Sequence, residues 1–240
     1  ALVRPRVAKL LRRPTVAGGI AGALLLLDPG AGREGGWIYT MWMGVWPQAL
    51  ATALQWMTFA WLVRLAHAEE VNATRAAGKI GLYAGLSILA HPISAPVLTL
   101  WIPVVAIVAL ARRRLVVTAL YGAGGLSLGA LMTAWWWLPM LSMRGWMASY
   151  GWLHSTWAKM GQAVVDHVAL TQNMPPAVGI LALVGGAWFL LNGGATQRAL
   201  IAATVLMWLA AGRDWVWLLR PDYLSEMFTH LQYQRFLIAA

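Results

Sequence analysis

Long apolar segments alternate with short polar ones along most of this chain. A helix needs about 20 apolar residues to cross about 30 Å of hydrocarbon. The segments Gly44–Val63 and Leu115–Leu138 meet this standard easily. Shorter apolar segments that we also interpret as crossings are Val16–Leu27, Ala177–Leu191 and Ala199–Gly212. The pattern predicts an all-α fold, a polytopic transmembrane helical bundle.

A further apolar run, Ile80–Ala111, is too long for one crossing. As one straight helix it would measure about 48 Å, at about 1.5 Å per residue. The motif HPISAP lies within it, and there Pro92 and Pro96 each remove a backbone donor and restrict the preceding residue. We therefore expect two helices with a break at HPISAP, a kink at Pro103, and about seven or eight helices in the whole chain.

The basic residues predict the orientation of these crossings, because cytoplasmic loops of membrane proteins collect Lys and Arg. With the N-terminal end in the cytoplasm, alternating crossings place most basic residues on the cytoplasmic side. These are Arg4, Arg6, Lys9, Arg12, Arg13, Arg64, Arg75, Lys79, Arg112, Arg113, Arg114 and Arg198. Most acidic residues then fall in outer loops, which we place near 28–43, 91–96, 139–176 and 213–232. The inverted topology would need the opposite bias.

Tryptophan and glycine positions add detail to this picture. Many of the 16 tryptophans flank the expected outer ends of crossings, as an interfacial belt does, although an indole face could also stack on a sugar ring. They are Trp37, Trp42, Trp46, Trp135, Trp136, Trp137, Trp146, Trp152, Trp157, Trp215 and Trp217. Gly81 with Gly85, and Gly125 with Gly129, are spaced four apart on apolar segments. That spacing predicts the close approach of a neighbouring helix at each pair.

Composition excludes several classes of protein. With 60% hydrophobic and 11% charged residues, the chain is not a soluble domain. The net charge is +10, but basic residues form short clusters at the ends of apolar segments, so we expect no nucleic-acid partner. The absence of cysteine excludes disulfides, thiolate catalysis and cysteine-ligated zinc. Because the chain starts at Ala1 and stops within an apolar run, we expect residues 1–240 to be one transmembrane domain, a fragment of a longer protein.

The first outer loop carries the strongest candidates for chemistry. Asp28, Arg33 and Glu34 lie close together there and precede two glycines. Carboxylates just outside the bilayer could ligate a divalent cation, or one could act as a base towards an acceptor hydroxyl. The alternative is that Asp28 ends a helix and Arg33 pairs with Glu34 in solvent.

His91 is a second candidate, because HPISAP places it near the outer membrane surface. Ionisable groups at such depths are functional candidates by default. A histidine at a helix break can also be a hydrogen-bonded structural residue, and the sequence leaves both interpretations open.

Two later outer segments carry further candidates. Arg144 and His154 lie in the long segment that continues to VVDHVAL, which could instead be a surface helix. Gln232 and Arg235 stand where the next crossing should begin. An arginine there could hold a phosphate in bidentate fashion, or it could extend to lipid headgroups.

The order of three motifs is similar to that of a known family. An outer DPG…REGGW loop leads into GVWPQAL, LAHPIS follows at a helix break, and LQYQRFL stands near the end. This order resembles a bacterial family of multi-pass proteins related to GT-C glycosyltransferases, sometimes labelled 6-pyruvoyl-tetrahydropterin synthase-related membrane proteins. The resemblance covers most of Leu24 to Leu237.

The resemblance implies a function and a set of site residues. GT-C enzymes transfer a sugar from a polyprenyl-phosphate donor to an acceptor on the outer side of the membrane, with an outer-loop acid as base or metal contact. It implies that Asp28 and Glu34 are the catalytic acids and the contacts for any divalent cation. It also implies that Arg235 contacts phosphate and that His91 lines the cavity. Further candidates for substrate binding are Gln232, Arg144 and His154. The chain departs from the family pattern in having no D-x-D motif.

Three functions therefore stand as hypotheses. The first is a GT-C-like glycosyltransferase of the bacterial inner membrane, with membrane lipids and a polyprenyl-phosphate-linked sugar as partners. The second is a non-catalytic scaffold or lipid-binding subunit of a larger membrane complex. A transporter is the third and least favoured, because the apolar segments lack the intramembrane acids that many proton-coupled transporters use.

Overall fold

The computed structural model describes residues 46–143, 156–162, 176–212 and 214–224. Within these ranges the chain is all helical and contains no strand, which confirms the predicted class. The elements are α4 (Trp46–His67), α5 (Ala73–Ala90), α6 (Ser94–Ala111), α7 (Leu115–Met132), α8 (Ala134–Ser142), α10 (Pro176–Asn192), α11 (Ala195–Ala211), α12 (Asp214–Leu219) and the 3-10 helix η2 (Pro221–Tyr223). Residues 157–162 are also helical. The expected crossing Val16–Leu27 lies outside the described residues.

Three of these helices are long and apolar enough to cross a membrane. The spans are Pro47–His67 in α4, Ser94–Ala111 in α6 and Leu115–Met132 in α7. Shorter apolar helices cover Leu183–Asn192 and Ala195–Ala211. The chain is therefore an integral membrane protein.

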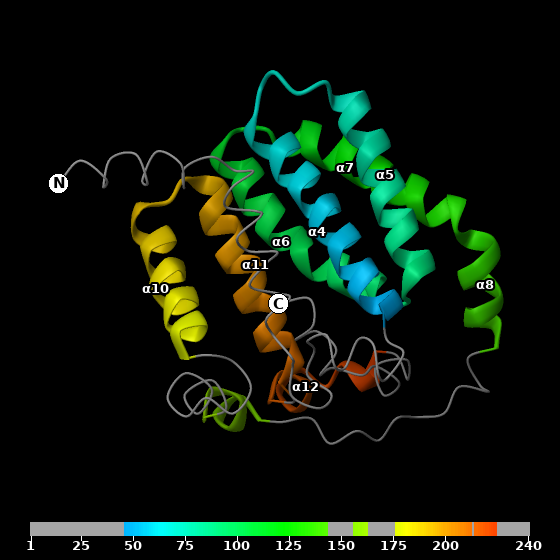
Figure 1. The fold of residues 1–240 in the computed structure, drawn as a ribbon. Coiled ribbons are helices and arrows are strands. Elements are labelled where there is room, and N and C mark those ends of the chain that lie inside the picture. The colour runs from blue at the N-terminus through cyan, green and yellow to red at the C-terminus, as the bar shows by residue number, and fades with distance from the viewer. Residues whose placement is uncertain (1–45, 144–155, 163–175, 213, 225–240) are drawn as a thin grey trace.

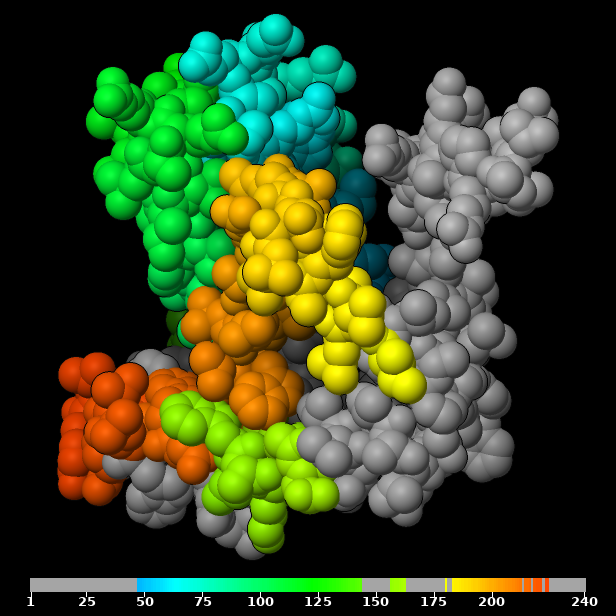
Figure 2. All heavy atoms as spheres, turned by 90° about the vertical axis from the view of Figure 1, so that its left-hand side faces the viewer, coloured from blue at the N-terminus to red at the C-terminus, as the bar shows by residue number. Residues whose placement is uncertain are grey.

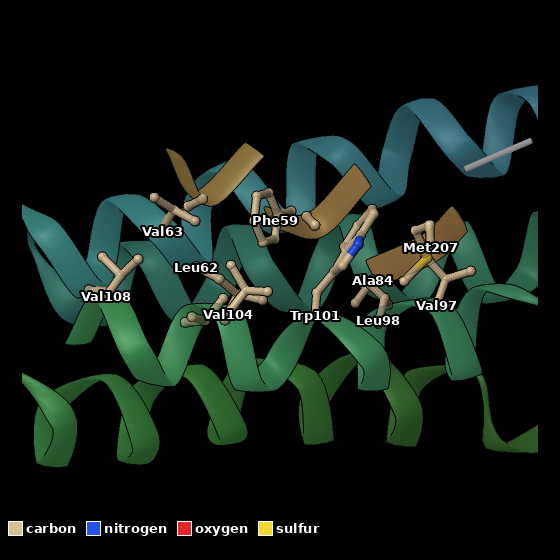
Figure 3. Close-up of a cluster of buried hydrophobic side chains, with 14 of the residues drawn as sticks. Phe59, Leu62, Val63, Ala84, Val97, Leu98, Trp101, Val104, Val108 and Met207 are labelled. Carbon is tan, nitrogen blue, oxygen red and sulfur yellow. The ribbon is translucent and has the colours of Figure 1, made fainter. Parts of the chain in front are cut away.

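Helix α4 lies at the centre of the bundle and packs against α5, α6, α7 and α11 (Figure 1). The core where α4 meets α6 is mainly aliphatic and contains the aromatic side chains of Phe59 and Trp101 (Figure 3). The Trp101 ring lies 4.7 Å from Trp56 and 5.0 Å from Phe59, centroid to centroid, and the last two rings meet edge to face at 5.6 Å. Tilted and edge-on arrangements of this kind are the favourable ones for aromatic pairs.

The bundle has two distinct ends. Helices α4 and α6 run parallel, because Gln55 contacts Ser94 towards one end and His67 contacts Arg112 at the other. We call the first the His91 end, where α4 and α6 begin and α5 and α7 stop (Figure 1). The opposite end, with the α4–α5, α6–α7 and α10–α11 turns, is the Arg113 end. The helices thus alternate in direction as the hydropathy pattern predicted.

The predicted break at HPISAP is confirmed. Helix α5 stops at Ala90 and α6 begins at Ser94, so the interruption is shorter than the outer loop expected at 91–96. Pro96 fits in the first turn of α6, where a helix needs no backbone N–H donors. Pro103 lies inside α6 and is exposed, and the helix continues past it to Ala111.

The crossing expected over Leu115–Leu138 is present but ends earlier than predicted, at Met132, because the run is divided at Thr133 into α7 and α8. The Thr133 hydroxyl donates to the carbonyl oxygens of Gly129 (2.9 Å) and Ala130 (3.1 Å). The Trp137 indole N–H also donates to the Ala130 oxygen, at 2.8 Å. These bonds satisfy the last carbonyls of α7, so the helix can stop there although the sequence remains apolar.

The later segments agree with expectation in outline. Helices α10 and α11 cover the two crossings expected after the long outer segment. The loop expected near 139–176 contains the last part of α8, the helical residues 157–162 and the first residue of α10. The loop expected near 213–232 contains α12 and η2.

The predicted glycine contacts are confirmed between α5 and α7. A Cβ added at Gly129 would lie 2.6 Å from the Gly81 carbonyl oxygen, and one at Gly81 would lie 2.9 Å from the Gly125 oxygen. A Cβ at Gly85 would lie 3.2 Å from the Gly129 oxygen. Backbone therefore meets backbone along this seam, which only glycine permits.

Candidate functional site

His91 is the one sequence-predicted site residue within the described ranges. The other six lie outside them: Asp28, Glu34, Arg144, His154, Gln232 and Arg235. The geometry around His91 therefore tests how one candidate is held, and for the others the structure describes only where neighbouring parts of the chain lie.

His91 terminates α5 and connects it to α6. Its backbone is extended (φ −159°, ψ 132°), and its N–H donates to the Ser87 carbonyl oxygen at 2.9 Å. Its half-buried ring accepts a hydrogen bond from the Ile93 N–H at Nδ1, over 3.2 Å. An acceptor nitrogen carries no proton, so this contact selects the tautomer with the proton on Nε2. The ring is thereby oriented by the break that it helps to form.

A buried polar network joins this break to α4. The Gln55 Nε2 donates to the Ser94 hydroxyl at 2.8 Å, and that hydroxyl donates to the Ser87 carbonyl oxygen at 2.7 Å. The Ser87 hydroxyl in turn donates to the Ala84 oxygen at 2.8 Å. We call Gln55, Ser87, His91 and Ser94 the break network. It fastens the end of α5 and the start of α6 to the middle of α4 through buried side chains.

Sequence reasoning missed three members of this network. Gln55, Ser87 and Ser94 are fully buried at 0% exposure, although each is polar and stands in an apolar segment. The available signal was on α4, where Gln48, Gln55 and Thr58 recur at helical spacing and all three are buried. A polar face on a membrane-crossing helix indicates contacts within the bundle, because lipid offers no hydrogen-bond partners.

Two buried polar atoms near this end have no hydrogen-bond partner within the described residues. They are the Gln55 Oε1 acceptor and the Trp101 indole donor. An unmet buried group of this kind costs about 1–3 kcal/mol. No group of three or more His, Cys, Asp or Glu residues in the described part of the chain could hold a metal ion. A metal site with three such ligands at the His91 end would therefore need at least one residue outside the described ranges.

A second arrangement at the His91 end fastens residues 157–162 to α11 and α12 (Figure 2). The Trp157 backbone N–H donates to the Asp214 carboxylate at 2.6 Å, and its indole N–H donates to the Leu209 oxygen at 2.9 Å. The Trp215 indole donates to the Ala210 oxygen, also at 2.9 Å. Two tryptophans expected in an interfacial belt thus satisfy the last carbonyl groups of α11. Sequence reasoning did not foresee that function.

The described residues that adjoin the segments with the other site candidates all lie at the His91 end (Figure 1). We call these residues the attachment points. Trp46 follows the Asp28 and Glu34 segment, Met143 precedes Arg144, Thr156 follows His154, and Leu224 precedes Gln232 and Arg235. All of these attachment points lie towards the end where α5 meets α6.

Comparison of the chain with models of protein families, with curated proteins and with solved structures finds no match. The assignment of a function therefore depends on the motifs and on the geometry described above.

Proposed function

We propose that the chain is a GT-C-like glycosyltransferase, which moves a sugar from a polyprenyl-phosphate donor to an acceptor on the extracytoplasmic side. The observation that carries the proposal is the common location of the attachment points. Each described residue that adjoins a candidate segment lies at the His91 end. The order of the motifs DPG…REGGW, LAHPIS and LQYQRFL supports the choice of sugar transfer among the possible activities.

In the proposed reaction, an acceptor hydroxyl oxygen attacks the anomeric carbon while the bond from that carbon to the phosphate oxygen breaks. The configuration at the anomeric carbon inverts. Asp28 or Glu34 accepts the hydroxyl proton, directly or with a divalent cation between them and the substrate. The charge that develops on the departing polyprenyl phosphate is balanced by Arg235, whose planar guanidinium suits phosphate. Gln232, Arg144 and His154 contribute to substrate binding.

His91 has a positioning function in this proposal. Its Nδ1 contact with Ile93 fixes the ring at the α5–α6 break, and the break network ties that break to α4. A ring held by the backbone N–H of Ile93 can line a cavity without moving when substrate binds, which lowers the entropic cost of binding.

The test is sugar transfer by membranes that contain the full-length protein or a variant. We expect Asp28→Asn or Glu34→Gln to lower the rate of transfer by at least about 100-fold, because a positioned base contributes that much. Glu69→Gln is the matched control, since Glu69 is an exposed carboxylate at the opposite end of the bundle. Its rate should equal that of the unaltered protein.

One observation favours the second candidate function, a non-catalytic scaffold or lipid-binding subunit. The hydrogen bonds described above for the break network join groups within the bundle, as a purely structural device would require. The same assay separates the two functions. Equal transfer by the unaltered protein, Asp28→Asn and Glu34→Gln, or no transfer by any of them, would reject the catalytic assignment and leave the scaffold.

A further inference from the structure

The Arg113 end gathers basic side chains from separate turns of the bundle. They are Arg64, Arg75, Lys79, Arg112, Arg113, Arg114 and Arg198. The α4–α5 loop and the first turns of α5 are neutral in sum, because Glu69 and Glu70 offset Arg75 and Lys79. The α6–α7 turn contains Arg112, Arg113 and Arg114 and no acid. We call these three residues the arginine turn.

The arginine turn is a Schellman motif that closes α6. The Arg114 N–H donates to the Ala109 oxygen at 2.8 Å, and the Arg113 N–H donates to the Leu110 oxygen at 3.0 Å. This pair of bonds places Arg113 at the position after the helix cap, where the backbone must be left-handed and glycine is the usual residue. Arg113 has a φ of 54°. An arginine therefore occupies a position that conformational preference assigns to glycine.

Arg112 and Arg114 form hydrogen bonds with the last turn of α4. Arg112 Nη2 lies 2.7 Å from Nε2 of His67, and Arg114 Nε donates to the Leu65 oxygen at 3.1 Å. Arg64, also in the last turn of α4, lies over the Trp61 ring at 5.2 Å. These contacts hold several guanidinium groups on one small area. Within the described ranges, none of the arginines of the turn has a carboxylate partner, and Arg113 is exposed.

We propose that the arginine turn, together with Arg64, binds the headgroup phosphate of an anionic phospholipid in the leaflet at the Arg113 end. The turn joins two helices that are long enough to cross the membrane, so it lies at the depth of the headgroups. Guanidinium groups match phosphate oxygens in geometry and charge. Phosphate binding would explain why an arginine occupies this strained backbone position, because a functional contact can offset local strain. This site is separate from the proposed sugar transfer at the His91 end.

The test measures lipid affinity by native mass spectrometry of the full-length protein in a neutral detergent, with phosphatidylglycerol and phosphatidylcholine as probes. We expect a preference for phosphatidylglycerol, and Arg113→Gln should weaken its binding about five-fold, the value of one basic residue near an anionic surface. Arg75→Gln is the matched control, because it removes the same charge at the same end from a segment that is neutral in sum. It should weaken binding less than two-fold.

Arg113→Gly separates the ligand contact from the fold. Glycine suits the left-handed backbone, so this variant should lose phosphatidylglycerol as Arg113→Gln does while its thermal midpoint in neutral detergent is unchanged or higher. Equal affinities for the two lipids, or equal losses in Arg113→Gln and Arg75→Gln, would overturn the proposal. The thermal midpoint of the unaltered protein gives a further test, with phosphatidylglycerol or inorganic phosphate added. If both raise the midpoint equally, the ligand is a free anion and the proposal is overturned.

Discussion

Gln55 and Ser94 differ in how well their polar atoms are satisfied, and the difference decides what each contributes. The Ser94 hydroxyl accepts from Gln55 and donates to the Ser87 carbonyl oxygen, so both of its functions are used. Gln55 donates once and leaves Oε1 without a partner in the described part of the chain. Removing a group that leaves partners unmet costs more than removing one that is itself unmet.

We therefore predict opposite outcomes for two substitutions in the break network. Gln55→Met keeps the volume and removes the unmet acceptor, so the free energy of unfolding should fall by less than about 1 kcal/mol or rise. Ser94→Ala leaves the Gln55 amide without an acceptor, and the free energy of unfolding should fall by about 1–3 kcal/mol. Denaturant titration in detergent micelles measures both. A larger loss in Gln55→Met than in Ser94→Ala would contradict this account of the network.

At this scale the sequence predicted the break itself but only part of its chemistry. Pro92 and His91 stand in HPISAP, so the position of the interruption follows from local backbone restriction. The contact from Gln55 to Ser94 joins residues 39 apart in the chain and arises from the packing of α4 on α6. Nothing local to either residue indicates that partner.

Helices α5 and α7 show how a local spacing becomes a packing surface. Both present glycines four residues apart, and the structure pairs the two sets so that the backbones touch. Such contact stabilises helix pairs in membranes, where burial of apolar surface from water contributes little between helices.

The seam predicts a position-dependent response to one added methyl group. In Gly129→Ala the new Cβ would lie 2.6 Å from the Gly81 oxygen and 2.9 Å from the Gly85 nitrogen, so the helices must separate. We expect a loss of about 1–3 kcal/mol in the free energy of unfolding. The control on the same helix is Gly124→Ala, because nothing lies within 4 Å of the Cβ position there. That variant should be neutral or more stable by up to about 1 kcal/mol. Equal effects in the two variants would refute the seam.

Element boundaries were predicted where a breaking residue marks them and missed where none does. The α5–α6 boundary follows from prolines, and the positions of the apolar helices α10 and α11 follow from hydropathy. The α7–α8 boundary depends on Thr133, whose hydroxyl takes the place of a backbone donor at the end of a helix. Threonine makes such bonds within helices as well, so its presence in an apolar run does not predict a stop.

For the molecule as a whole, the important property is the separation of its two ends. The described turns at the Arg113 end collect most of the described basic residues, and the attachment points of all candidate segments lie towards the His91 end. The alternation of crossings inferred from charge therefore has a counterpart in space. Both proposals depend on it, since each assigns a different chemistry to a different side of one membrane.

The most direct test of this separation uses the absence of native cysteine. Single cysteines replace exposed residues at the His91 end (Pro92, Lys159) or at the Arg113 end (Glu70, Arg198), and sealed vesicles of each variant are treated with a membrane-impermeant maleimide. We predict that Pro92→Cys and Lys159→Cys react from one side of the membrane and that Glu70→Cys and Arg198→Cys react from the opposite, cytoplasmic side. Reaction of Pro92→Cys and Glu70→Cys from the same side would contradict the two-ended arrangement.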